Sequence, residues 1–371
     1  MDRFEIFLMA PPGLEPVLAE EAREAGFDVA QVVPGGVTIE GGWPDVWRAN
    51  LTLRGAGRVQ ARIGEFRAFH LAQLDKRARK FPWGDVLRPD VPFRVEVATN
   101  RKSKIYHAGA AQQRIETAIA EELGAPLDPK ADLTIRARID DNLVILSVDT
   151  SGQPLHKRGH KEAVGRAPLR ETMAALLLRA CGYRGTEPVL DPMCGSGTFV
   201  IEAAEIAAGL APGRTRSFAF ETLATFDADA WAKMSGFSAP ALPDLRFYGS
   251  DRDAGAFGSA NANAERAGLS DVCTFAKRAI SDLEAPEGPP GLVMVNPPYG
   301  ARIGDKKPLY GLHGALGEVL RSRFCGWRVG IVTSEASLAR ATGLPFASES
   351  KPIAHGGLRV RLYQTDALPT P

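Results

Sequence analysis

Close-spaced cysteines and long apolar runs are both lacking in this sequence. Its 371 residues include four cysteines, Cys181, Cys194, Cys273 and Cys325, and no two are spaced like a zinc site or a dithiol. No apolar run approaches the length of a membrane span, and residues 1–6 hold no apolar core of signal-peptide length. We therefore expect a cytoplasmic protein with neither a metal centre nor a membrane partner.

An excess of charge of either sign is also lacking. The 45 Lys and Arg residues nearly balance the 44 Asp and Glu residues, so the formal net charge is +1 and a uniformly basic coat is excluded. Any nucleic-acid site must therefore be regional. With 44% hydrophobic residues, the chain can bury a large core and is long enough for two or three domains.

Cations nevertheless gather in residues 51–150, most densely between Arg54 and Lys104, where 13 Lys and Arg residues outnumber five Asp and Glu residues. One cluster of Lys and Arg alone is typical of a solvated helix face. Several clusters, with the aromatic residues Phe81, Trp83 and Tyr106 beside them, favour contact with an RNA or DNA backbone. The candidate RNA-binding residues, which include two cations of the following linker, are Lys76, Arg77, Arg79, Lys80, Arg101, Lys102, Lys104, Lys157 and Arg158.

Two histidines four residues apart, His156 and His160, stand in the linker of residues 151–170. They are not interpreted as metal ligands, because no carboxylate or cysteine is spaced to complete a coordination shell and the neighbouring cations would repel a metal ion. We expect a positively charged hinge near the substrate instead.

The amino-terminal part of the chain is predicted to form two small units. Residues 1–50 alternate short apolar strands with one helix, which is typical of an α+β unit. Residues 51–152 are expected to close with a helix at 110–123 and two strands at 133–139 and 143–149.

The remaining residues, 153–371, predict one larger domain. From residue 188 onward, strand and helix patterns alternate, which indicates a parallel sheet with helices on both faces. Two strand-like runs end the chain, and the turn between them is short, so the last strand, at residues 358–364, should be antiparallel.

A strand, a glycine turn and a helix start follow one another in residues 189–199. Gly195 and Gly197 let a ligand touch the backbone, and Asp191 at the strand end can receive an amino group. A dinucleotide site would need a third glycine in place of Val200, and a phosphate-binding loop would need Gly-Lys-Ser or Gly-Lys-Thr. The turn therefore suits a ligand that has an amino acid moiety and no pyrophosphate.

The next strand ends at Asp251, whose carboxylate is placed to accept both hydroxyls of a ribose. The alternative role is to cap the following helix, for which Asp253 is also suited. Residues 278–282, after the third strand, could line an adenine pocket.

Asn296-Pro297-Pro298-Tyr299 follows a short apolar run, residues 291–295, that reads as a buried strand. The prolines stiffen the turn, so the Asn296 side-chain oxygen and the Pro297 carbonyl could point outward and accept both hydrogens of an exocyclic amine. Tyr299 would give a base a face on which to stack. The alternative interpretation is an ordinary tight turn after a strand.

The aspartate before a glycine turn, the ribose acid and the strand-terminal Asn-Pro-Pro-Tyr resemble class I S-adenosylmethionine-dependent methyltransferases that act on exocyclic amines of bases. The linker Leu155-His156-Lys157-Arg158-Gly159, the helix start at 167–169 and residues 211–221 narrow the resemblance. They are similar to bacterial RNA guanine-N2 methyltransferases with an amino-terminal THUMP domain, a group often labelled N6-adenine-specific DNA methylases. Residues 103–106 match the THUMP region, so the resemblance covers essentially the whole chain.

The resemblance implies an α/β fold in three parts. A Rossmann-like class I methyltransferase domain with a mixed sheet (153–371) would follow a ferredoxin-like unit (1–50) and a THUMP RNA-binding unit (51–152). S-adenosylmethionine is the implied cofactor, and RNA is the implied partner. The implied catalytic residues are Asn296, Pro297, Pro298 and Tyr299. The implied cofactor-binding residues are Asp191, Cys194, Gly195, Gly197, Thr198, Asp251, Arg252, Ser281, Asp282 and Asn296.

One position departs from the family pattern. The family usually has an aspartate where this chain has Ala279, and that aspartate holds the adenine amino group. Here the acid comes three residues later, as Asp282, so Ser281 or a backbone group could take over this contact.

The function implied is methyl transfer to the exocyclic N2 of a guanosine, with 23S rRNA as the expected substrate. The alternatives are a tRNA guanine-N2 methyltransferase, an adenine-N6 DNA methyltransferase and, in a different class, a non-catalytic RNA-binding protein with a vestigial cofactor fold. Cys194 and Cys325 lack a companion histidine for a covalent route, so both are expected to be packing residues.

Overall fold

The computed structural model describes residues 3–162, 169–236, 242–298 and 307–370. The chain divides into two compact units. The amino-terminal unit comprises Met1–Ala10, Ala19–Leu155 and Gly213–Gly236, and the carboxy-terminal unit comprises Pro11–Leu18, His156–Pro212 and Phe237–Pro371. Among the helices that are described, none is both long enough and apolar enough to cross a membrane.

The amino-terminal unit is built on a seven-stranded sheet, ordered β2-β3-β1-β4-β7-β6-β5. Only β5 and β6 pair in parallel. The strands are β1 (Phe4–Met9), β2 (Asp28–Val33), β3 (Gly36–Gly41), β4 (Val59–Arg67), β5 (Phe93–Thr99), β6 (Leu133–Asp140) and β7 (Leu143–Asp149).

Strand β4 joins the two small units predicted from the sequence into one sheet. It pairs with β1 on one side and with β7 on the other. The sequence did not predict this strand, because Arg62, Glu65 and Arg67 interrupt its apolar alternation and only Val59 and Ala61, near its start, are buried. The sheet therefore continues across the expected boundary at residue 50, which falls inside helix α2.

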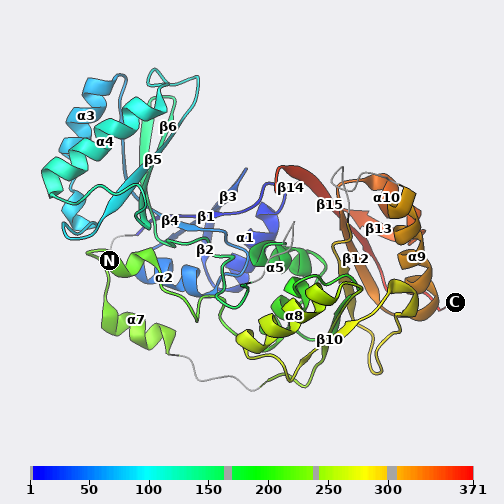
Figure 1. Cartoon of the computed structure of the whole chain (residues 1–371). Coiled ribbons are helices and arrows are strands. Elements are labelled where there is room, and N and C mark those ends of the chain that lie inside the picture. Colours follow the sequence, from blue (N-terminus) through cyan, green and yellow to red (C-terminus); the bar gives the residue numbers. More distant parts are fainter. Residues whose placement is uncertain (1–2, 163–168, 237–241, 299–306, 371) are drawn as a thin grey trace. The chain divides into compact units, whose positions relative to one another are not determined.

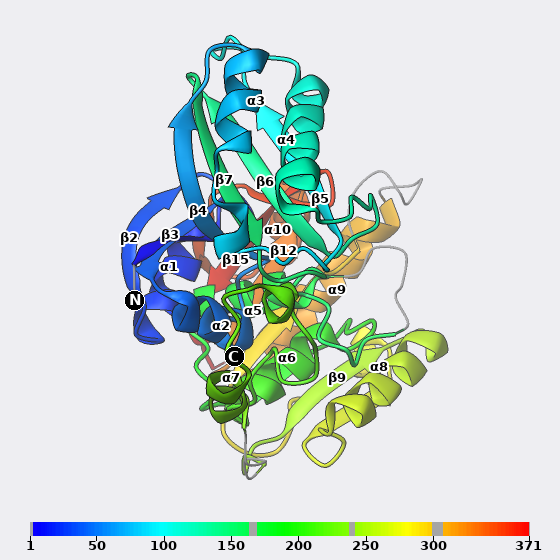
Figure 2. The same cartoon turned by 90° about the vertical axis from the view of Figure 1, so that its left-hand side faces the viewer.

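The helices of this unit include a pair, α3 and α4, that pack against each other beside the sheet (Figure 2). Helix α1 is shared, since its first turn is assigned to the other unit. The helices are α1 (Glu15–Glu24), α2 (Trp43–Thr52), α3 (Leu71–Arg79), α4 (Ala108–Leu123) and α7 (Ala228–Ser235), with short 3-10 turns at Trp83–Asp85 and Ala219–Thr222.

Residues 213–236 return from the carboxy-terminal part of the sequence to complete the amino-terminal unit (Figure 1). The Arg216 guanidinium donates to the carbonyl oxygens of Ser151 (3.0 Å) and Pro154 (2.8 Å). The Phe220 ring lies at the centre of an aromatic cluster and is fully buried. Its neighbours are Trp47, Phe218, Phe226 and Trp231, with ring centroids 5.0 to 6.1 Å away.

Phe220→Ala should destabilise the amino-terminal unit by about 3–5 kcal/mol, because it opens a cavity inside this cluster. Urea unfolding followed by tryptophan fluorescence would measure the loss, since Trp47 and Trp231 report directly on the cluster. Val32→Ala is the matched control, because Val32 is an exposed apolar side chain of the same unit. Equal effects of the two changes would contradict the role given to residues 213–236.

The carboxy-terminal unit is built on a second sheet, ordered β10-β9-β8-β11-β12-β15-β13 (Figure 1). Strands β8 to β12 pair in parallel, whereas β15 is antiparallel to β12 and β13. The expected antiparallel last strand is thus confirmed. The strands are β8 (Val189–Asp191), β9 (Phe247–Asp251), β10 (Cys273–Lys277), β11 (Leu292–Val295), β12 (Arg328–Thr333), β13 (Phe346–Glu349), β14 (Ile353–His355) and β15 (Leu358–Thr365).

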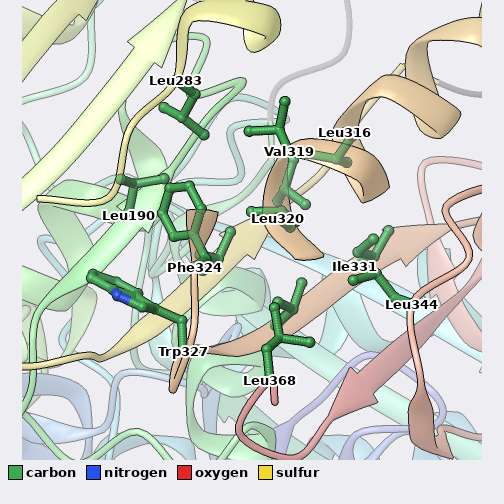
Figure 3. Packing of buried hydrophobic residues seen from close by; sticks show 13 residues of the cluster. Leu190, Leu283, Leu316, Val319, Leu320, Phe324, Trp327, Ile331, Leu344 and Leu368 are labelled. Atoms are coloured by element: carbon green, nitrogen blue, oxygen red, sulfur yellow. The ribbon is translucent and has the colours of Figure 1, made fainter. Parts of the chain in front are cut away.

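Helices cover both faces of this sheet. Its helices are α5 (Glu171–Ala180), α6 (Thr198–Ala207), α8 (Ala254–Ala267), α9 (Lys307–Arg323) and α10 (Ala336–Ala341), with a 3-10 turn, η3 (Ile280–Asp282). On one face, Val293 and Ile331 pack with Leu320 and Phe324 at the end of α9 (Figure 3). On the other face, the Met294 sulfur lies 3.7 Å from Cys181 at the end of α5.

The strand order brings the carboxyl ends of β9, β8 and β11 next to one another, because these three strands are parallel neighbours. Asp251, Asp191 and Asn296 stand at these ends. In an open α/β sheet, this edge is where ligands bind.

Candidate active site

The glycine turn between β8 and α6 is hydrogen-bonded to the end of the neighbouring strand, β9. The Cys194 amide donates to the Ser250 carbonyl (2.9 Å), and the Gly195 amide donates to the Asp251 carboxylate (3.1 Å). Gly195 and Gly197 both have a left-handed backbone, with φ of 53° and 82°. Apart from its chain neighbours, no atom of the described residues lies within 4 Å of the place where a Cβ of Gly195 would stand, so this side of the backbone is open among them.

Asp251 is held in a fixed orientation at the end of β9. Its second oxygen accepts from the Asp253 amide (2.9 Å), while Asp253 itself caps α8 by accepting from the Ala256 amide (2.8 Å). The capping role considered for Asp251 therefore belongs to Asp253. The structure brings Asp251 against the glycine turn, as the predicted site requires.

Asp191 is almost fully buried, and the Met193 amide donates to its Oδ1 at 3.0 Å. Burial raises the pKa of this carboxyl to about 8, and the nearby charge of Asp251 raises it further in the same direction. Within the described residues, no cation pairs with Asp191. A buried carboxylate without a cation is suited to a ligand that brings an ammonium group.

Asn296 follows the last residue of β11 and is half-buried. Its side-chain oxygen is shielded from solvent, and no donor in the described part of the chain reaches it. The sequence suggested an acceptor that points outward, so the structure differs in that the oxygen is covered. Pro297 is buried and Pro298 is exposed, whereas Tyr299 lies outside the described residues.

Thr198, the first residue of α6, has a partner that sequence reasoning missed. Its hydroxyl lies 2.9 Å from the ammonium of Lys161, which also pairs with Glu171 at 3.3 Å. The Leu169 carbonyl is a third partner of the same ammonium, at 2.8 Å. Only the positive charge of the linker pointed to Lys161, and its partners are eight or more residues away.

Cys194 is buried beneath the turn, and burial together with the charges of Asp191 and Asp251 raises the pKa of its thiol. A thiol that resists ionisation is a poor nucleophile. This agrees with the packing role expected for Cys194. Cys325 is exposed, and its sulfur lies 3.4 Å from the Thr370 hydroxyl.

The predicted adenine-contact residues lie farther along the sheet edge. Arg252 is exposed, and Ser281 and Asp282 are exposed in η3, where the Ser281 hydroxyl donates to Asp282 (3.0 Å). The Ser281 carbonyl accepts from Arg323 of α9 (2.9 Å). No hydrogen bond between described residues joins η3 to the glycine turn.

A mostly apolar cavity of about 260 Å³ opens beside β9 and β10. Tyr248, Thr274 and Arg278 line it, together with residues 283–286. None of Asp191, Asp251 or Asn296 lines this cavity. The oriented carboxylates and Gly195 therefore lie outside the lining of this cavity.

The linker is not the exposed charged hinge that the sequence suggested. Arg158 is only 3% exposed and pairs with Glu202 of α6 at 3.4 Å. His160 is also buried, with Nδ1 4.0 Å from Glu205 of the same helix. Burial and the surrounding cations lower the pKa of His156 to about 4, so that ring is neutral at pH 7. The prediction that Arg158 contacts RNA is therefore wrong for this structure, whereas Lys157 is exposed.

Arg158→Met should lower the stability of the carboxy-terminal unit by about 3–5 kcal/mol, because Glu202 stays buried and loses this cation. Urea unfolding would measure this loss. The salt dependence of RNA binding should not change. The control for both urea unfolding and RNA binding is Lys157→Met, because Lys157 is an exposed cation of the same linker. A smaller salt slope at unchanged stability would restore Arg158 as an RNA contact.

The other predicted RNA-binding residues belong to the amino-terminal unit. Lys76, Arg77 and Lys80 are exposed along α3 and just after it. Arg79 is different, because ion pairs with Asp75, Glu121 and Glu122 surround its guanidinium and raise its pKa. Its charge is thus already matched by protein carboxylates. Arg101, Lys102 and Lys104 are exposed in the loop before α4.

Among the described residues, no group of three or more His, Cys, Asp or Glu side chains is placed to hold a metal ion.

Two family models match the chain. A model of the RMKL-like methyltransferase domain matches residues 158–364, and a model of the RlmL ferredoxin-like domain matches residues 5–60. The first therefore covers the whole glycine turn and the Asn-Pro-Pro stretch.

Three similar proteins extend this comparison. A ribosomal RNA large subunit methyltransferase K/L of Vibrio campbellii is 33% identical over 342 residues, which are 88% of this chain and 48% of that protein. A putative RNA methyltransferase of Synechocystis is 30% identical over 369 residues, which are 96% of this chain and 95% of that protein. The crystal structure of a putative methyltransferase complexed with SAH has a TM-score of 0.88 at 28% identity and covers 100% of both chains. The chain spans about half the length of the K/L relatives that it matches.

Proposed function

Because the chain belongs to the RMKL-like methyltransferase family, we propose that it methylates the exocyclic N2 of a guanosine in large-subunit (23S) ribosomal RNA. The observation that carries the choice of an amine is the Asn296 oxygen, a buried acceptor that no described donor reaches. A buried acceptor without a donor costs free energy, so a substrate N–H group that displaces the atoms now shielding this oxygen would satisfy it.

S-adenosylmethionine is the cofactor of this family, and it supplies a methyl carbon bonded to a sulfonium. The residues at the glycine turn fit it. Asp191 is a buried carboxylate that lacks a cation among the described residues and matches the ammonium of the methionine part. Asp251 is oriented by two backbone amides and matches a pair of ribose hydroxyls, while Gly195 leaves its backbone open.

Asn296 and Pro297 orient the amine for in-line attack. Asn296 Oδ1 and the Pro297 carbonyl each accept one hydrogen of the NH2 group, which turns the nitrogen lone pair away from both oxygens. No strong base would be needed beforehand, since the nitrogen would bond to the methyl carbon as the carbon–sulfur bond breaks and the thioether leaves, and the extra proton would pass to water only afterwards. The guanine has to turn out of its stack to reach this corner.

The RNA substrate is supported by the amino-terminal unit. We propose that residues 51–152 act as a THUMP-type RNA-binding unit and that residues 1–50 are its ferredoxin-like companion. The exposed cations Lys76, Arg77, Arg101, Lys102 and Lys104 are available for phosphates. An adenine-N6 DNA methyltransferase would share the Asn-Pro-Pro corner but would have no need for this unit.

The test is methylation of ribosomal RNA, transfer RNA and DNA in parallel with a labelled methyl donor, followed by mass spectrometry of the nucleosides. N2-methylguanosine in ribosomal RNA is the expected product. Label in transfer RNA alone would change the substrate, and label in DNA alone would overturn the proposal. Binding of RNA and cofactor without any transfer would favour the non-catalytic alternative.

A further inference from the structure

Three loops of the amino-terminal unit meet at one end of its sheet. The antiparallel register places Arg67, the last residue of β4, opposite Leu143, the first residue of β7. The parallel register places Thr99, the last residue of β5, beside Ile139 near the end of β6. Residues 68–70, 100–107 and 141–142 therefore emerge together, and we call them the loop end.

Two aromatic side chains are exposed at the loop end. Tyr106 is 76% exposed, more than any other large apolar side chain among the described residues, and Phe69 is 41% exposed. The ammonium of Lys104 lies 5.5 Å from the centre of the Phe69 ring. Exposed rings beside cations are typical of surfaces on which bases stack.

Asn142 braces both loops that carry these rings. It has a left-handed backbone, with φ of 63°, and its side chain is buried. Its carbonyl accepts from the Ala68 amide, and its Oδ1 accepts from the Lys104 amide, both at 2.9 Å. One residue of the β6–β7 turn thus fixes the backbone just before Phe69 and two residues before Tyr106.

Histidine caps fix the other side of each ring. His70 Nδ1 accepts from the Gln73 amide (3.2 Å) at the start of α3, and His107 Nδ1 accepts from the Ala110 amide (3.1 Å) at the start of α4. Phe69 and Tyr106 each come directly before one of these caps. The exposed rings are therefore held between anchored residues on both sides, which limits the entropy lost when a base stacks on them.

Cations outnumber acids at the loop end. Two carboxylates are present. Asp140 pairs with Arg138 (3.2 Å), whereas the side chain of Asp141 is exposed and only its backbone carbonyl accepts from Arg67 (3.2 Å). The exposed cations are Arg67, Arg101, Lys102, Lys104 and Arg138. A surface with this balance attracts a polyanion.

We propose that the loop end binds an unpaired segment of the RNA substrate, with bases stacked on Tyr106 and Phe69 and phosphates on Arg101, Lys102 and Lys104. This inference rests on the proposed RNA function and adds the strandedness of the RNA. In a duplex, the faces of the bases are covered by their neighbours, whereas a single strand can offer them to an exposed ring.

The test compares a fluorescent twelve-nucleotide RNA with its duplex, using the full chain. Tyr106→Ala should weaken single-strand binding about tenfold and leave duplex binding unchanged, because stacking on one ring is lost. Tyr106→Phe should bind like the unchanged protein. Leu127→Ala is the matched control, an exposed apolar side chain of the same unit outside the loop end.

Two further variants separate stacking from charge and from folding. Lys104→Gln should reduce the slope of log affinity against log salt by about one phosphate contact, whereas Tyr106→Ala should leave the slope unchanged. Asn142→Gly keeps the left-handed turn and removes only the Oδ1 brace, so it should weaken single-strand binding while the thermal unfolding temperature changes little.

Unchanged single-strand affinity in Tyr106→Ala would overturn the inference, as would an equal loss for the duplex. If the protein methylates RNA but Tyr106→Ala does not change single-strand binding, the proposed function stands and the inference about the loop end fails. If Tyr106→Ala weakens single-strand binding but the protein methylates no RNA, the inference about the loop end is supported and the proposed function is overturned.

Discussion

Asn296→Ala lowers the methyl transfer rate by about a hundredfold or more, and leaves affinity for S-adenosylhomocysteine and for RNA unchanged. Loss of one positioned partner of a reacting group typically has this size. The affinity is retained because Asn296 Oδ1 makes no hydrogen bond to the described protein, so its removal breaks no such bond there. Single-turnover rates at saturating RNA, with calorimetric binding of the cofactor product, would measure both quantities.

Asn261→Ala is the matched control for this prediction. Asn261 is exposed on α8 and donates only to the Phe257 carbonyl of its own helix (3.0 Å), so its loss should change neither rate nor affinity. An unchanged rate in Asn296→Ala would dispose of the role given to the buried oxygen. A rate loss matched by an equal loss of cofactor affinity would show that Asn296 shapes the pocket instead of holding the amine.

Asp191→Asn has the opposite character, since it should stabilise the folded protein without cofactor and remove cofactor binding. The Asp191 carboxyl has a pKa of about 8 in the folded chain because it is buried, and of about 3.9 in an unfolded chain. Between these values folding must take up a proton, so stability falls as pH rises from about 4 to about 8. The cost is on the order of 4 kcal/mol at pH 7.

The side-chain amide introduced by Asp191→Asn carries no charge and escapes that cost. The melting temperature of the variant should therefore exceed that of the unchanged protein at pH 8, and the difference should vanish near pH 4. The carbonyl oxygen of the new amide can still accept from the Met193 amide. Asp253→Asn is the control, because Asp253 is an exposed helix cap and asparagine can cap a helix as well.

Cofactor binding gives the second readout for Asp191. At pH 7 the free carboxyl is mostly protonated, because burial raises its pKa to about 8, and it must ionise to hold the cofactor's ammonium, so binding should release close to one proton. Calorimetry in buffers of different ionisation enthalpy measures this release. Asp191→Asn should release none and should bind about a hundredfold more weakly or worse, since the ammonium loses its buried partner. Proton release that persists in the variant would contradict the assignment.

Local patterns in the sequence were enough to predict the carboxy-terminal unit. Strands β8 and β11 are short buried apolar runs, and the glycine turn and the start of α6 follow directly from Gly195 and Gly197. Strand β4 could not be found in this way, because charged residues interrupt its apolar alternation and two of them, Glu65 and Arg67, are solvent-exposed. Its place in the sheet comes from pairing with β1 and β7, which are distant in sequence.

The candidate site shows the same division. Asp191, Asp251 and Asn296 could be predicted because each stands at the end of a strand, and strand order alone brings them together. The burial of Arg158 could not be predicted, because its partner Glu202 stands 44 residues later on α6. Charge in a sequence shows where cations occur, but whether they face solvent or a buried acid depends on tertiary packing.

The segment 213–236 has a consequence for how the protein is made. The amino-terminal unit lacks its aromatic cluster until Phe218, Phe220 and Trp231 have left the ribosome, although its last strand, β7, ends at Asp149. At about 5–20 residues per second, synthesis of the residues between these two points takes several seconds. During that time the indole of Trp47 lacks the rings of Phe220 and Phe226 that pack against it in the finished unit, so apolar surface is left open to a chaperone. A fragment that stops at residue 155 would remain in that unfinished state.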